Sequence, residues 1–316
     1  MTDSSANNAT STSIAAAKKD RQQGLLAALS AFLLWGVFPL YFKLLGDIPV
    51  LEILANRIVW SLLLVLIIIT FTGRFSRVFA ALKDRKTMLI FLASTSVIAL
   101  NWVTFVWAIT NDRVLEASLG YYINPLVNVG LGMLFLGERL NRWQGLAIGL
   151  ATLAVLIMTV LMGSLPWVSL VLGFSFGFYG LLRKKVQAES VVGLTIETGL
   201  LFPISFAYIG YLTLSGTLHG GSLSGQFYEI DTLLLLAGTG FVTAVPLILF
   251  SFGAQRLRLT TVGILQYVAP TMHIIWAIFI FKEDFSQAQF AAFSLIWAGL
   301  LIYTWDGLRS RGRKSS

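Results

Sequence analysis

The sequence predicts an all-α polytopic membrane protein in which ten transmembrane helices form two inverted five-helix repeats. Three observations lead to this prediction: the composition, a series of long apolar segments, and one stretch that occurs twice. Of 316 residues, 56% are hydrophobic and only 12% are charged, and the mean hydropathy is +0.79. Soluble domains carry about 25% charged residues, so most of this chain is expected to contact lipid.

Ten apolar segments are each long enough to cross a membrane as a helix. About 20 residues at 1.5 Å per residue span the roughly 30 Å of hydrocarbon. Helices are required because lipid offers no water to an exposed backbone amide, and the strands of a membrane barrel would be shorter. The predicted spans are 24–45, 50–72, 88–110, 114–136, 143–162, 165–182, 191–214, 232–252, 260–281 and 287–306.

Both ends of the chain are predicted to be polar tails. Residues 1–23 are rich in Ser, Ala, Asn and Thr, which favours a disordered cytoplasmic tail. A signal peptide is not expected, because the first apolar run has the length of a full helix and no small-residue cleavage site follows it. Residues 307–316 are predicted to be a basic cytoplasmic tail.

The net charge of +8 comes from loops on one side of the predicted membrane. With the N-terminus inside, 19 of the 23 Lys and Arg residues fall in cytoplasmic segments. Only Lys43, Arg113 and Lys282 fall outside, and Arg57 lies within the second segment. By the positive-inside rule, this bias places both termini in the cytoplasm and explains the basic charge without a nucleic-acid partner.

The stretch YYINPLVNVGLGMLFLGE at 121–138 has a second copy, QYVAPTMHIIWAIFIFKE, at 266–283. At a constant shift of 145 residues, Leu119, Tyr122, Pro125, Glu138 and Gln144 fall on Ile264, Tyr267, Pro270, Glu283 and Gln289. The predicted repeats, 24–162 and 163–306, each hold five helices, and an odd number forces the copies into opposite orientations. Inverted repeats of this kind are typical of transporters that work by alternating access.

Two prolines occupy equivalent positions near the middle of the fourth and ninth segments. Proline removes a helix hydrogen bond and kinks a membrane helix where neighbours satisfy the freed carbonyl. We interpret Pro125 and Pro270 as hinges of two opposed gates. A static packing kink is an equally good interpretation.

Three ionisable residues within the apolar segments are candidates for the substrate path. Arg57, Glu116 and Glu197 would each cost about 2.5–3.5 kcal/mol to insert, so they are expected to face the bundle interior. We expect Arg57 to pair with Glu197 or, as second choice, with Glu116. The pair either borders the substrate path or only joins helices, and we favour the substrate path.

Other polar and aromatic side chains recur at helical spacing beside the prolines. Two of them have alternative interpretations. His273 can be a hydrogen-bonded core residue, and Trp102 can be an interface anchor. The candidate substrate path comprises Arg57, Asn101, Trp102, Glu116, Tyr122, Asn124, Asn128, Glu197, Gln266, Tyr267 and His273.

Small-residue pairs predict close helix packing within the chain. Gly145-x-x-x-Gly149 and Gly173-x-x-x-Gly177 favour internal contacts over a dimer seam, although a homodimer is a possible partner state. The charged sequence KED at 282–284 is predicted to be a solvated loop.

Several stretches closely resemble the RarD permeases, which belong to the EamA division of the drug/metabolite transporters. They include LLWGVFPLYFK at 33–43, EILANRIVWS at 52–61, LEASLGYYINPLVNVGLGMLFLGERL at 115–140 and RLRLTTVGILQYVAPT at 256–271. The resemblance runs from about residue 22 to 306. It implies a ten-helix transporter of the bacterial inner membrane, in a family annotated through chloramphenicol sensitivity.

The predicted function is therefore secondary transport, with export of small metabolites or drugs by alternating access. The alternative is a membrane-embedded enzyme acting on lipid-like substrates, which would need a clustered acid, base or metal. No ATP-binding, nucleophile or metal motif occurs, and no cofactor is expected. The chain contains no cysteine and only two histidines, which leaves little material for a metal site.

Overall fold

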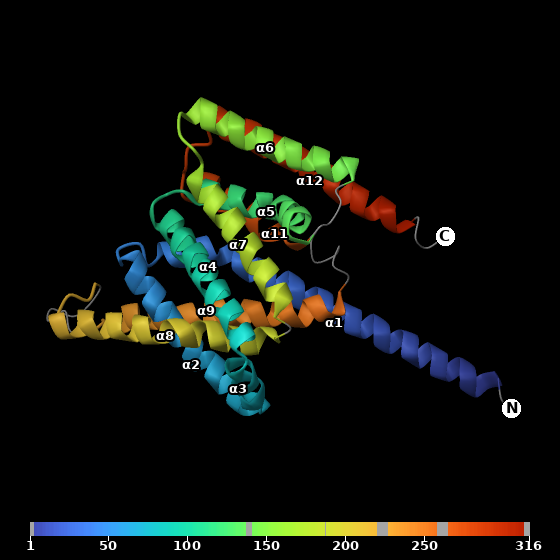
Figure 1. The fold of residues 1–316 in the computed structure, drawn as a ribbon, viewed down its shortest axis with the longest axis horizontal. Coiled ribbons are helices and arrows are strands. Elements are labelled where there is room, and N and C mark those ends of the chain that lie inside the picture. Colours follow the sequence, from blue (N-terminus) through green and yellow to red (C-terminus); the bar gives the residue numbers. More distant parts are fainter. Residues whose placement is uncertain (1–2, 137–140, 187, 220–226, 258–264, 313–316) are drawn as a thin grey trace.

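The computed structural model describes residues 3–136, 141–186, 188–219, 227–257 and 265–312, and we discuss only these. Within them the chain is helical and contains no β-ladder (Figure 1). The helices are α1 (Asp3–Lys43), α2 (Val50–Thr72), α3 (Phe75–Lys83), α4 (Arg85–Thr110), α5 (Val114–Leu136), α6 (Arg142–Met162), α7 (Trp167–Lys185), α8 (Ser190–Ser215), α9 (Ile230–Arg256), α11 (Val268–Ile275), the π-helix η1 (Trp276–Ile280) and α12 (Gln287–Gly312).

The helical membrane class predicted from composition is confirmed. Among the described residues, seven helices are long and apolar enough to cross a membrane: parts of α1, α2, α4, α6, α8, α9 and α12. Two shorter apolar helices, Trp167–Arg183 and Val268–Ile280, overlap the sixth and ninth predicted segments. The fourth predicted segment coincides with α5.

Two features at the ends of segments differ from the predictions. α1 begins at Asp3, whereas the sequence predicts a disordered tail over 1–23, and the alanines at 15–17 favour this helical extension. The extension projects away from the other helices (Figure 1). The amphipathic helix α3 was not predicted, because its nine residues fall in a polar loop between two spans. Gly73 ends α2 at a φ of 65°, and α3 follows directly.

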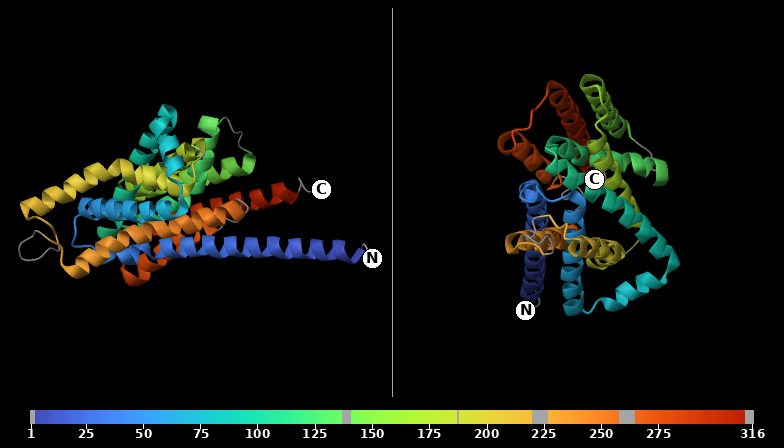
Figure 2. Two further views of the ribbon diagram at one scale, coloured as in Figure 1. Left: turned by 90° about the horizontal axis from the view of Figure 1, so that it is seen from below. Right: turned by 90° about the vertical axis from the view of Figure 1, so that its left-hand side faces the viewer.

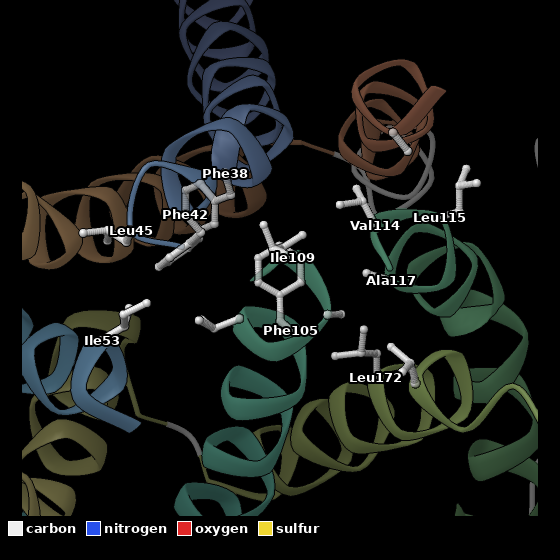
Figure 3. Packing of buried hydrophobic residues seen from close by; sticks show 14 of the residues in the cluster. Phe38, Phe42, Leu45, Ile53, Phe105, Ile109, Val114, Leu115, Ala117 and Leu172 are labelled. Atoms are coloured by element: carbon white, nitrogen blue, oxygen red, sulfur yellow. The ribbon is translucent and has the colours of Figure 1, made fainter. Parts of the chain in front are cut away.

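The helices pack in a small number of extensive pairs. α6 lies along α12, α1 along α9, α4 along α7, and α2 along both α8 and α9 (Figures 1 and 2). α5 packs on α7 and contacts α11. An apolar core formed mainly by α1, α4, α5 and α7 includes Phe42, Phe105 and Leu172 (Figure 3).

Glycines permit the close approach of α5 and α7. A Cβ atom at Gly120 would lie 2.8 Å from the carbonyl oxygen of Ser169, and one at Gly173 would lie 2.9 Å from Ile123. The predicted internal packing of the Gly173 pair is thus confirmed. For Gly145 and Gly149 it is wrong, because open space surrounds both positions.

Helices α6 and α12 begin with the same hydrogen-bonding device. Asn141 accepts from the backbone N–H of Gln144, whose side chain accepts from the backbone N–H of Asn141 at 3.2 Å. Ser286 and Gln289 make the same reciprocal pair at 3.2 and 2.8 Å. Each pair is a capping box that satisfies two amide groups at a helix start. The two boxes are 145 residues apart.

Candidate substrate path

Arg57 is buried between helices of the bundle, and no acidic side chain in the described ranges forms an ion pair with it. Its side chain is 4% exposed, and its Nε donates to Thr243 Oγ1 of α9 at 2.7 Å. The guanidinium carbon lies 4.6 Å from the centre of the Trp102 ring and 5.6 Å from that of Phe42. Nη1 is buried and has no hydrogen-bond partner. α1, α2, α4 and α9 therefore enclose a cation that is held mainly by aromatic faces.

The predicted pairing of Arg57 with a glutamate is wrong. Glu197 instead accepts from Ser94 at 2.9 Å and from Tyr179 at 3.0 Å, and it lies 3.9 Å from Arg183. Glu116 pairs with Arg113 at 3.1 Å, three residues earlier on the chain. The prediction rested on depth along each helix, which says nothing about the direction in which a side chain leaves the helix axis.

A fully buried glutamate that sequence analysis missed holds the start of α2. Glu52 accepts from the backbone N–H of His219 at 3.1 Å and from the Tyr228 hydroxyl at 2.8 Å. The same carboxylate lies 3.0 Å from the ring nitrogen Nδ1 of His219. Burial and the neighbouring carboxylate raise the pKa of Tyr228, which keeps this hydroxyl a donor. The sequence placed Glu52 at a membrane boundary and gave no sign of these distant partners.

Asn101, Tyr121 and His273 form a polar and aromatic group beside the apolar core. Asn101 donates to Ser175 Oγ at 2.9 Å and to the Leu172 carbonyl at 3.1 Å, which joins α4 to α7. Tyr121, absent from the predicted path, donates to Asn101 at 3.4 Å. His273 Nε2 lies 3.1 Å from the Trp35 carbonyl, so this nitrogen is the donor and Nδ1 is left buried and unpaired.

The remaining predicted residues lie along α5 and its copy. Tyr122 stacks on Tyr267 with ring centres 6.0 Å apart and an interplanar angle of 16°. Asn128 donates to Asn124 at 2.9 Å, as expected for neighbours on one helix face. Gln266 lies in a turn immediately before α11. The structure thus brings Arg57 to Trp102 and Tyr122 to Tyr267, but it places Glu116 and Glu197 in separate ion pairs.

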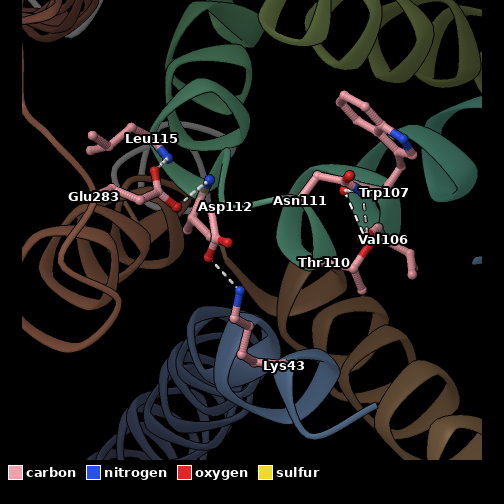
Figure 4. Close-up of polar contacts among 9 residues, drawn as sticks. Lys43, Val106, Trp107, Thr110, Asn111, Asp112, Leu115 and Glu283 are labelled. Atoms are coloured by element: carbon pink, nitrogen blue, oxygen red, sulfur yellow. Dashed lines mark hydrogen bonds and ion pairs between the residues drawn. The ribbon is translucent and has the colours of Figure 1, made fainter. Parts of the chain in front are cut away.

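A second polar cluster, which we call the Glu283 junction, joins the loop after η1 to the start of α5. Glu283 accepts from the backbone N–H groups of Val114 at 2.7 Å and Leu115 at 2.9 Å (Figure 4). Lys43 forms an ion pair with Asp112 beside it (Figure 4). Burial is the main cause that raises the pKa of Glu283. The interpretation of residues 282–284 as a solvated loop is wrong for this carboxylate.

The backbone is unusual on both sides of the Glu283 junction. Asp112 and Lys282 have φ angles of 54° and 57°, and no other non-glycine residue in the described ranges has a positive φ. Such angles are uncommon for residues with a side chain. A cavity of about 470 Å³ opens here and is lined by residues of both loops, such as Asp284, and of the first turn of α5, such as Glu116.

Comparison with known proteins places this architecture in a family. A model of the EamA-like transporter family matches residues 22–160. "Uncharacterized transporter YojE" of Bacillus subtilis is 43% identical over 302 residues, covering 94% of this chain and 98% of that protein. "Protein RarD" of Escherichia coli is 40% identical, covering 94% of this chain and 99% of that protein. The chain belongs to the EamA family, as a RarD-type permease.

A further relative agrees with this membership, and one solved structure shares the fold. "Chloramphenicol-sensitive protein RarD" of Pseudomonas aeruginosa is 30% identical, covering 91% of this chain and 95% of that protein. A solved structure described only as "Crystal structure of protein" superposes with a TM-score of 0.57 at 16% identity, covering 88% of this chain and 96% of the other. The RarD-type permease is therefore a multi-pass protein of the inner membrane, in a family of transporters.

Proposed function

We propose that this RarD-type permease is a ten-helix secondary transporter that exports small metabolites or drugs by alternating access. The observation that carries the proposal is the stacking of Tyr122 on Tyr267. These two residues are equivalent in the 145-residue repeat. A residue that contacts its own equivalent lies next to the axis that relates the two repeats, as expected if opposed gates meet at a central site.

Helix packing supports the same repeat. The pairs α6 with α12 and α2 with α8 each join helices that the repeat makes equivalent. The pair α1 with α9 corresponds to the pair α7 with α4, and both are extensive. The capping boxes at Asn141 and Ser286 preserve the 145-residue shift in local structure. We therefore assign residues 24–162 and 163–306 to the two repeats.

The proposed substrate path runs between α2, α4, α5 and α11. Arg57 and His273 support this assignment, because each keeps a buried nitrogen without a partner inside the bundle. Buried polar groups in a membrane protein are expensive and usually functional. A membrane-embedded enzyme is not favoured by any contact described above, and the named relatives are transporters or RarD proteins. Association of two copies of the permease into a homodimer stays a prediction from the sequence.

Topology is the first test of the proposal. Reporter fusions after Arg85 and after Ser316 are expected to behave as cytoplasmic, because the basic loops lie there. A reporter inserted between residues 220 and 226 is expected to behave as external. A cytoplasmic signal from that insertion would rule out the ten-helix arrangement.

Transport is the second test. A thermal-shift screen of the purified permease against metabolites and antibiotics is expected to give organic ligands, because a ligand that binds the folded state stabilises it by mass action. The ligands found should then show counterflow in proteoliposomes. Ion flux at channel rates, or a substrate set of inorganic ions alone, would contradict alternating access at this aromatic site.

A further inference from the structure

Glu52, Glu116 and Glu197, which lie within the described apolar helices, all have partners other than Arg57. Glu52 holds His219 and Tyr228, and Glu116 pairs with Arg113. The third, Glu197, belongs to the separate cluster around Arg183. Arg57 is therefore a buried cation without a counter-ion among the described residues.

The groups around Arg57 compensate its charge only in part. Thr243 Oγ1 accepts one hydrogen bond from Nε, and its own hydroxyl donates a hydrogen bond to the Thr239 carbonyl at 2.8 Å. The rings of Trp102 and Phe42 attract the cation through their π faces. Nη1 still points at no acceptor. A guanidinium offers several N–H groups in a planar fork, and a carboxylate matches that fork with two parallel hydrogen bonds.

We propose that Arg57 is the anion-binding group of the substrate site and that the permease transports organic carboxylates with an apolar or aromatic body. The carboxylate accepts from the guanidinium, and the body lies among Trp102, Phe42 and Tyr121. This inference rests on the proposed function, because it needs a cycle that opens the centre of the bundle to each face in turn.

The chain supplies a matched control in Arg183. That side chain is also largely buried, but it lies 3.9 Å from Glu197. Removing it leaves a buried carboxylate with less compensation, which is destabilising. Removing Arg57 instead takes away a charge that has no counter-ion within the part of the chain that the structure describes.

The experiment measures Tm of the purified permease with benzoate or benzamide, which share a ring and differ in charge. At concentrations about 100-fold above Kd, benzoate is expected to raise the Tm of the wild type by about 2 °C or more, whereas benzamide leaves it unchanged. The Arg57→Gln variant should show no Tm shift with benzoate. Without ligand, its Tm should equal or exceed that of the wild type. Arg183→Gln should unfold at a lower Tm and keep the response.

A second variant keeps the test decisive if Arg57→Gln does not fold. Arg57→Lys retains the charge but not the fork, so it is expected to need about ten-fold more benzoate for the same shift. Three results would overturn the inference: no benzoate response in the wild type, an equal response in the Arg57 variants, or a loss of ligand-free stability in Arg57→Gln as large as in Arg183→Gln.

The same measurements separate this inference from the proposed function. Binding is read at equilibrium and needs no turnover. Benzoate binding through Arg57 without counterflow of any substrate would contradict the proposed function and leave the anion site intact. Counterflow of a neutral substrate at the wild-type rate by Arg57→Gln would contradict the anion site and leave alternating access intact.

Discussion

The two copies of the repeated stretch share their sequence pattern but differ in structure. α5 runs without interruption from Val114 to Leu136 and includes Pro125. In the copy, a turn at 266–267 precedes α11, and the helix changes to the π-helix η1 at Trp276. A conformation of an alternating-access protein that is open to one face is expected to show such a difference, because one gate is then open while the other is closed.

The prolines explain part of this difference. Pro125 lies inside α5, where the missing N–H leaves the carbonyl four residues earlier without its helical partner. Pro270 lies in the first turn of α11, where N–H groups have no partner within the helix in any case. The same residue therefore costs a hydrogen bond in one copy and none in the other.

The largest expected effect concerns the different neighbours of the two copies. Gly120 of α5 contacts α7, whereas the repeat places Leu265 at the equivalent position. Gly120→Leu would drive a side chain into the Ser169 carbonyl and Leu172, so we expect a loss of about 3 kcal/mol or failure to fold. Thermal unfolding in detergent measures this. Gly130→Ala, with open space around it, is the control, and equal stability of both variants would show that α5 and α7 separate easily.

A smaller effect is expected at the start of α5. Glu283→Ala would leave the N–H groups of Val114 and Leu115 without their acceptor, which we expect to cost about 1–3 kcal/mol. Asp284→Ala is the control, since this neighbour lines the same cavity without bonding α5. If the two variants unfold at the same temperature, water replaces Glu283 fully and the junction does not anchor α5.

The smallest stability effect is the pH dependence of the Glu283 junction. Burial raises the pKa of Glu283 above its value in the unfolded chain. The stabilisation that follows from this shift is therefore fully present below the unfolded pKa of about 4.3. That contribution is lost as pH rises through the folded pKa. As pH rises from about 4 to about 7, the Tm of the wild type should therefore fall relative to that of Glu283→Gln. A constant difference across this range would contradict the assigned shift.

Sequence analysis predicted the helical class, because that depends on composition and on the length of apolar segments. It also predicted that Asn124 and Asn128 are neighbours, since both lie on one helix. It failed for Arg57, Glu52 and Glu283, whose partners come from distant helices or loops. No local pattern encodes how helices rotate about their axes, and that rotation decides which buried charges meet.

The central claim is that the two copies act as opposed gates, and cysteine accessibility tests it most directly. In this cysteine-free chain, single reporters at Asn124 and Ala269 can be labelled from either membrane face in variants with Pro125→Ala or Pro270→Ala. Pro125→Ala restores a hydrogen bond in the state described here, whereas Pro270→Ala favours a state in which the ninth segment is continuous. We predict opposite changes in labelling for the two variants. Identical changes, or none in labelling or transport, would contradict the account and leave both prolines as static kinks.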